Sequence, residues 1–306
     1  MPNKMEETPK QEIPTKIGNW HDRNYKLMLL IPLGLLVASI IIISSFYATH
    51  GDFFNKDISL TGGTSATIYD KENAEQLKVD LADKLEGIHT REIYDLVTRE
   101  QKAIIIQTKA DGETTKKVLE EYFGHELNEE NSSFEFTGSS LSESFQKQLL
   151  IAILIAFFFM AIVVFIIFRT AIPSAAVIIS AFADIVMTLA LVDIFGMQMS
   201  TAGIVAFLML IGYSVDTDIL LTTRLLKRDE GSLNNRIMGA FKTGTTMTLT
   251  SLLAVTVALF VVSSFSVILT QIFTVLVIGL AFDLVNTWIT NVSILKWYVE
   301  HKEKKR

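Results

Sequence analysis

The chain has 306 residues, of which 50% are hydrophobic, with a mean hydropathy of +0.39 and a net charge of −6. The composition is too apolar for an ordinary soluble domain, and the apolar residues occur in long blocks, so the sequence predicts a membrane protein. There is no cysteine, which excludes a disulfide framework, thiol chemistry and a thiolate metal site.

Residues 1–26 are polar and are expected to form a cytoplasmic tail ahead of an uncleaved first span, because the apolar run that follows is too long for a signal peptide. Blocks of this length cross a bilayer as helices. The six expected spans are residues 27–47, 148–168, 172–195, 202–223, 244–262 and 268–295. Residues 224–243 and 296–306 are expected to form a cytoplasmic loop and a cytoplasmic C-terminal tail.

Lysine and arginine residues predict the orientation, because short cytoplasmic segments carry an excess of them. The first tail holds five, and others lie in the loop 224–243 and after residue 295. Both termini are therefore expected in the cytoplasm, and residues 48–147 are expected outside it. That segment has 20 acidic and 11 basic residues, a net charge of −9, which argues against a nucleic-acid partner.

Residues 48–147 have a pattern of strands and helices of their own. The first strand is expected to be broken by a bulge or bend at Gly62 and Gly63. The expected strands lie at 57–70, 91–98, 103–109 and 133–138, and the expected amphipathic helices at 72–86 and 114–123. The order βαββαβ predicts a ferredoxin-like α+β domain. Residues 140–148 are expected to be helical and to continue into the second span.

The sequence contains no recognisable catalytic constellation. Gly62-Gly63-Thr64 lacks the spacing and the lysine of a phosphate-binding loop, and the five histidines are scattered outside the spans. We therefore expect no enzyme activity, no cofactor and no metal site.

Four aspartates lie inside the expected spans: Asp184 in the third, Asp216 and Asp218 in the fourth, and Asp283 in the sixth. An acid near the bilayer centre costs at least ~2.5 kcal/mol, so such residues usually face a bundle interior or a wet cavity and have a function. No basic residue lies deep in any span. The four aspartates are therefore candidates for proton or ion coupling.

Helical spacing predicts polar neighbours for these acids. Ser214, Asp218 and Thr222 share one face of the fourth span, whereas Asp216 lies about 200° around the same helix from Asp218. The expected supporting network comprises Ser214, Thr217, Thr222, Arg224, Thr246, Thr250 and Thr287. The alternative is that these polar groups only hold helices together by interhelical hydrogen bonds.

Several stretches resemble the SecF family, the smaller subunit of the SecDF accessory complex, within the resistance-nodulation-division permease superfamily. These stretches are Leu60-Thr61-Gly62-Gly63-Thr64, Gly138–Glu143, Ala183-Asp184-Ile185 and Ile211-Gly212-Tyr213-Ser214. The resemblance covers about residues 20–300, and with it we expect a permease-like bundle of six helices.

The sequence departs from the bacterial members of that family. They place a single acid opposite Thr217 and an arginine at the start of the fifth span, where this chain has Lys242. Asp216 and Asp218 flank Thr217 as in the archaeal form. The resemblance therefore transfers only the role of the acid, onto Asp216 or Asp218.

The resemblance implies a subunit that pairs with SecD beside the SecY translocon, contacts the translocating polypeptide, and uses the proton motive force to assist export. The basic cytoplasmic cluster is expected to contact membrane lipids. Two alternatives stay open: half of a small-molecule or lipid exporter of the same superfamily, and a scaffold that stabilises SecD or the translocon. The coupling ion, H⁺ or Na⁺, is also open.

Overall fold

The computed structural model describes residues 25–95, 98–227, 232–264 and 266–303. Most of the expected N-terminal tail, residues 228–231 of the expected loop and residues 304–306 of the expected C-terminal tail lie outside the described residues.

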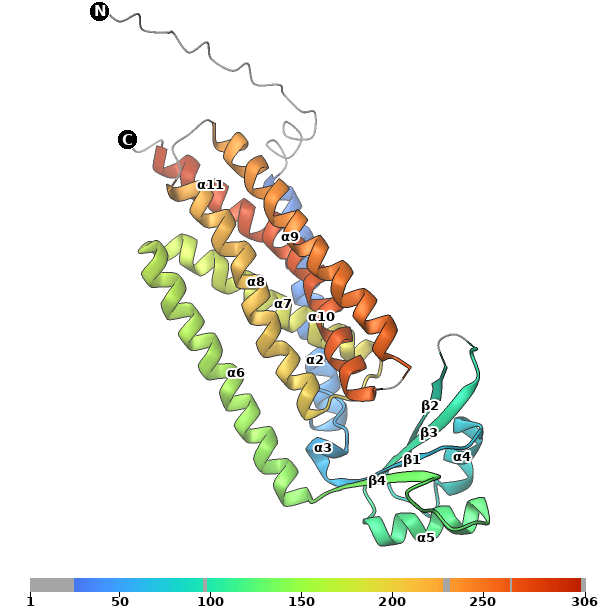
Figure 1. Cartoon of the computed structure of the whole chain (residues 1–306). Helices are drawn as coiled ribbons and strands as arrows, with labels where there is room; N and C mark the ends of the chain where they lie inside the picture. Colours follow the sequence, from blue (N-terminus) through green and yellow to red (C-terminus); the bar gives the residue numbers. More distant parts are fainter. Residues whose placement is uncertain (1–24, 96–97, 228–231, 265, 304–306) are drawn as a thin grey trace, which may run out of the picture.

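Six helices in the described residues are long and apolar enough to cross a membrane, and a sheet domain lies between the first and second of them (Figure 1). This is the predicted fold class. The helices are α2 (Leu30–His50), α6 (Ser139–Phe168), α7 (Ala171–Ile194), α8 (Thr201–Lys227), α9 (Leu233–Val262) and α10 (Val267–Val285), the last continuing through a π-helical segment, η1 (Asn286–Asn291), into α11 (Val292–Glu303).

Two helices extend by two turns or more beyond the expected spans, and α8 also continues to Lys227, into the expected loop. α9 begins at Leu233 rather than at residue 244, because the Ser232 side chain accepts a hydrogen bond from the Asn235 N–H and caps the helix. The last span continues as helix to Glu303, through residues expected to form a tail. Hydropathy locates only the apolar part of a helix, so polar turns at its end are missed.

The sheet domain contains α3 (Ile58–Thr61), β1 (Gly63–Ile68), α4 (Ala74–Leu81), β2 (His89–Tyr94), β3 (Gln101–Thr108), α5 (Gly112–Phe123) and β4 (Ser132–Thr137). Its strands pair antiparallel in the order β2-β3-β1-β4, the ferredoxin-like arrangement that the sequence predicts. Side chains such as Ile68, Leu77, Ile104 and Leu119 form the core between the sheet and its two longer helices.

The prediction of a strand over residues 57–70 was wrong for its first part, where residues 58–61 form helix α3. The Asp57 side chain accepts from the Ser59 N–H and caps this helix, and Gly62 ends it with a φ of 81°. The helix expected at 72–86 ends at Leu81, and the strand expected at 91–98 ends at Tyr94, with residues 96–97 outside the described part.

At one end of the helical bundle the first span contacts the last helix, and the other end bears the sheet domain. The Tyr25 hydroxyl donates to Glu300 Oε2 at 3.0 Å, and the Ser293 hydroxyl donates to the Tyr25 carbonyl at 3.2 Å. The start of the first span therefore packs against the last helix, while the sheet domain lies at the opposite end (Figure 1). α7 and α8 are the most buried spans, and α2, α6 and α9 are peripheral.

Candidate functional site

Three of the four predicted aspartates meet inside the bundle. Asp184 of α7, Asp218 of α8 and Asp283 of α10 each have no exposed surface. α7, α8 and α10 pack against one another, so each helix contributes one acid to a common polar cluster. We call these three acids, together with the side chains that contact them, the acid cluster.

Asp184 links three segments of the bundle. Its Oδ2 accepts from the Ser214 hydroxyl at 2.5 Å, and its Oδ1 accepts from the Asn286 amide at 2.7 Å. Ser214 belongs to the predicted network, whereas Asn286 was missed. Asn286 lies three residues after Asp283, a spacing that puts two side chains on one helix face and could have identified it.

Asp218 is held by the π-helical segment. Its Oδ1 accepts from the Thr287 hydroxyl at 2.9 Å and from the Asn291 amide at 2.7 Å. The Thr287 hydroxyl also lies 3.1 Å from Asp283 Oδ1. Thr287 therefore bridges the acids of α8 and α10.

The π-helical segment Asn286–Asn291 brings Asn286, Thr287 and Asn291 into the acid cluster together. Single π turns inside α-helices are rare and often lie at functional sites. The sequence predicted an uninterrupted helix over 268–295, because the apolar pattern on both sides of the turn is the same. The π-helical segment packs against α7 and α8.

Several buried polar atoms around the acids have no hydrogen-bond partner among the described residues. They include the second carboxyl oxygens of Asp218 and Asp283 and the hydroxyl of Thr222. In the same part of the chain no group of three or more His, Asp or Glu side chains converges as metal ligands do. The acid cluster therefore contains polar atoms with unused hydrogen-bonding capacity.

Asp216 lies outside the acid cluster, exposed on another face of α8. Thr217 is buried and its hydroxyl lies 3.5 Å from that of Thr248 on α9. Arg224 donates to the Gly239 carbonyl and, at 3.0 Å, to the Thr243 hydroxyl. It therefore links α8 to α9, and among the described residues it forms no ion pair with an acid.

Two threonines of α9 that were expected in the supporting network do not contact the acids. Thr246 and Thr250 are exposed, and their hydroxyls donate to carbonyls of their own helix, those of Lys242 at 2.7 Å and of Thr246 at 2.8 Å. Helical hydroxyls commonly bond the carbonyl four residues back. The α9 threonines that contact α8 are Thr248, through Thr217, and Thr243, through Arg224.

Residues 115–301 match the family model described as protein export membrane protein SecD/SecF, C-terminal. The protein-export membrane protein SecF of Methanocaldococcus jannaschii is 40% identical over 289 residues, which are 92% of this chain and 99% of that protein. The chain belongs to the SecF family. SecF of Methanothermobacter thermautotrophicus is 36% identical over 91% of this chain and 94% of its own length. Membership makes the chain a protein-export membrane protein and not an enzyme.

A solved structure shares the fold. The crystal structure of SecDF, a translocon-associated membrane protein from Thermus thermophilus, matches 94% of this SecF chain with a TM-score of 0.73 and 16% identity. The SecF chain spans 39% of the length of that longer chain.

Proposed function

We propose that this SecF-family chain works with SecD beside the Sec translocon and uses the proton motive force to assist export. The observation that carries the proposal is the Thr287 hydroxyl, which lies within hydrogen-bond distance of both Asp218 and Asp283. A hydroxyl has one hydrogen and cannot donate to two carboxylates at once. The pair is satisfied when one acid carries a proton and donates it to the Thr287 oxygen.

The energy available from one proton is large compared with the contacts of the cluster. Moving one charge across ~100 mV yields about 2.3 kcal/mol. An interhelical hydrogen bond in a membrane contributes about 0.6 kcal/mol on average. Adding or removing one proton at the Thr287 bridge can therefore repack α8 against α10.

The start of α8 is hydrogen-bonded to the segment that precedes the first strand of the sheet domain. The Thr201 N–H, at the start of α8, donates to the Ser59 hydroxyl of α3 at 2.9 Å. The Met199 N–H donates to the Asn55 carbonyl at 2.7 Å. We call these contacts, together with Asp57 and Gln271, the root joint.

α10 also reaches the root joint. Gln271 Oε1 accepts from the Ser200 N–H at 3.1 Å. Burial raises the pKa of the Asp57 carboxyl, and hydrogen bonds from Ser59 and Gln271 act in the opposite direction. The two helices that carry Asp218 and Asp283 therefore both contact the base of the domain.

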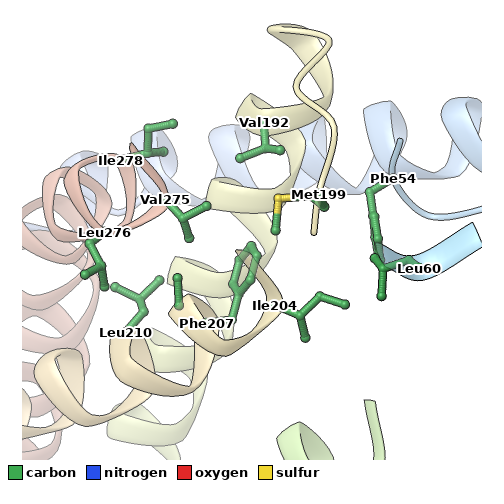
Figure 2. Close-up of a cluster of buried hydrophobic side chains, with 11 residues drawn as sticks. Phe54, Leu60, Val192, Met199, Ile204, Phe207, Leu210, Val275, Leu276 and Ile278 are labelled. Carbon is green, nitrogen blue, oxygen red and sulfur yellow. The ribbon is translucent and has the colours of Figure 1, made fainter. Parts of the chain in front are cut away.

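Apolar packing stiffens this connection. Figure 2 shows Phe54 and Leu60, which precede the sheet, in the same buried cluster as Met199, Phe207 and Val275 of the bundle. Interiors packed in this way transmit small shifts rather than absorb them. A displacement of α8 against α10 is thus passed to the domain, and we propose that this movement helps draw the emerging polypeptide outward.

Loosening the root joint is expected to uncouple the domain from the acids. The double variant Ser59→Ala/Gln271→Leu removes the hydrogen bonds of these two side chains. It should lower export of a secreted reporter several-fold, measured in cells at equal membrane levels of the protein.

The matched control holds the root joint closed with a covalent bond. Because the chain has no cysteine, Ser59→Cys/Thr201→Cys introduces the single possible intramolecular disulfide. Oxidation should leave export intact, because α8 and the base of the sheet domain are expected to move together. Loss of export on oxidation would contradict this joint movement.

The exposed face of α8 supports the pairing with SecD. Thr217 faces α9, and Val215 packs in a cluster with Val164 of α6, which leaves Gly212 and Asp216 uncovered between those helices. A carboxylate facing lipid tails is costly. Glycine allows a second helix to approach closely. We infer that a SecD helix covers this face.

Gly212→Leu is expected to weaken the association with SecD about tenfold, or about 1.4 kcal/mol. Among the described residues, and apart from the backbone of its own helix, a Cβ at Gly212 meets no atom within 4 Å. The variant should therefore fold normally while its side chain blocks an approaching helix. Co-purification of tagged SecD measures the effect. Gly34→Leu on α2, where a Cβ also has open space, is the matched control. Equal recovery of SecD with both variants would exclude this face as the contact.

A further inference from the structure

Asp193 is a buried acid that lies outside the acid cluster. It lies in the last turn of α7, with 8% of its surface exposed. Neither carboxyl oxygen has a hydrogen-bond partner among the described residues. The ring of His50 is near enough to act on it electrostatically, but no hydrogen bond joins the two side chains.

The position of Asp193 is unfavourable in every protonation state. The C-terminal end of a helix carries partial negative charge, which repels a carboxylate. A buried ion without a partner costs several kcal/mol. A protonated carboxyl would still leave a buried donor and acceptor unsatisfied. A cation with N–H donors beside Asp193 would remove all of these costs.

A pocket of about 370 Å³ lies next to this carboxyl, between the end of α7 and the peripheral helix α2. Its lining consists of Ile41, Ile42, Ser45, Phe46, Thr49, Asp193 and Ile194. Ile41 and Ile42 lie deeper along α2, while Thr49 lies near the end of the helix, on the side of the sheet domain. The pocket is therefore apolar toward the middle of the bundle and polar toward its end.

We propose that this pocket binds a membrane lipid whose headgroup carries a primary ammonium. The ammonium donates to Asp193, and the upper part of an acyl chain lies along Ile41, Ile42 and Phe46. A primary ammonium has three N–H donors for the two open carboxyl oxygens, whereas a quaternary ammonium has none. One carboxylate and two hydroxyls are too few ligands for Ca²⁺, which takes six to eight oxygens. A volume of about 370 Å³ suits a headgroup with part of a chain, and is small for a helix.

The test uses the purified full-length protein in detergent and follows thermal unfolding with added lipid. Phosphatidylethanolamine should raise the unfolding temperature by several degrees, because a ligand of the folded state stabilises it. Phosphatidylcholine and phosphatidylglycerol should not. In Asp193→Asn the response to phosphatidylethanolamine should disappear, while the lipid-free protein unfolds at a higher temperature than the wild type because an unpaired buried charge is gone.

Glu143→Gln is the matched control, because it neutralises an exposed carboxylate near the domain end of α6 and should keep the wild-type response. An equal shift with phosphatidylcholine, or a shift retained in Asp193→Asn, would overturn the proposal. The same shift with free ethanolamine or with NaCl would show a site for small cations and would also overturn it. The proposal would also be overturned if SecD stabilised the protein through Asp193 while no lipid changed the unfolding temperature.

Discussion

Asp218→Asn is expected to lower export of a secreted reporter sharply while the protein stays in the membrane at its normal level. Loss of one proton's contribution, about 2.3 kcal/mol at 100 mV, corresponds to a roughly 50-fold change in an equilibrium. The substitution is nearly isosteric. Oδ1, which accepts from Thr287 and Asn291, is retained, and the new amide group occupies the Oδ2 position, which has no partner among the described residues. The fold should therefore tolerate the change.

The measurement is the rate of reporter export, with membrane levels followed by immunoblotting. Thr250→Val is the matched control, because Thr250 is a polar residue of a span that bonds only the backbone of its own helix, and its export should be normal. Normal export in Asp218→Asn at normal levels would contradict ion coupling and would favour a scaffold that stabilises SecD or the translocon.

Gly62→Ala is expected to cause a large loss of stability. Gly62 has a φ of 81°, which costs a residue with a side chain about 1–3 kcal/mol. A Cβ there would also lie 2.5 Å from the Cα of Ser139, where α6 begins, and forcing such contacts costs a further 1–3 kcal/mol or so. Gly62 is thus the point where α3, β1 and α6 meet too closely for any side chain.

Thermal unfolding of the purified variant measures this loss, together with its level in the membrane. Gly112→Ala is the matched control, because Gly112 opens α5 with ordinary helical geometry and a Cβ there has open space. That variant should be as stable as the wild type or slightly more stable. An unchanged unfolding temperature for Gly62→Ala would contradict the close approach of α6 to this glycine.

The sequence analysis found the three acids of the acid cluster, missed Asn286 and added two threonines that lie outside it. Asp184, Asp218 and Asp283 were identifiable because a carboxylate inside an apolar span is unusual by itself. Asn286 was missed because an amide inside an apolar span costs less free energy than a carboxylate, and is therefore a weaker sign of function. Thr246 and Thr250 were included on spacing alone, although each hydroxyl is satisfied within its own helix.

Local sequence patterns are enough to predict the spans and most elements of the sheet domain. Runs of apolar residues define the six spans, and the switch between periods of two and 3.6 predicts the ferredoxin-like domain. The rotation of each helix about its axis, in contrast, depends on how the helices pack against one another. Asp216 and Asp218 are equally good candidates on one helix, and packing against α7 and α10 turns Asp218 inward. The surroundings of Asp193 depend on packing in the same way, because its pocket is lined by residues of α2 and α7 that are distant in the sequence.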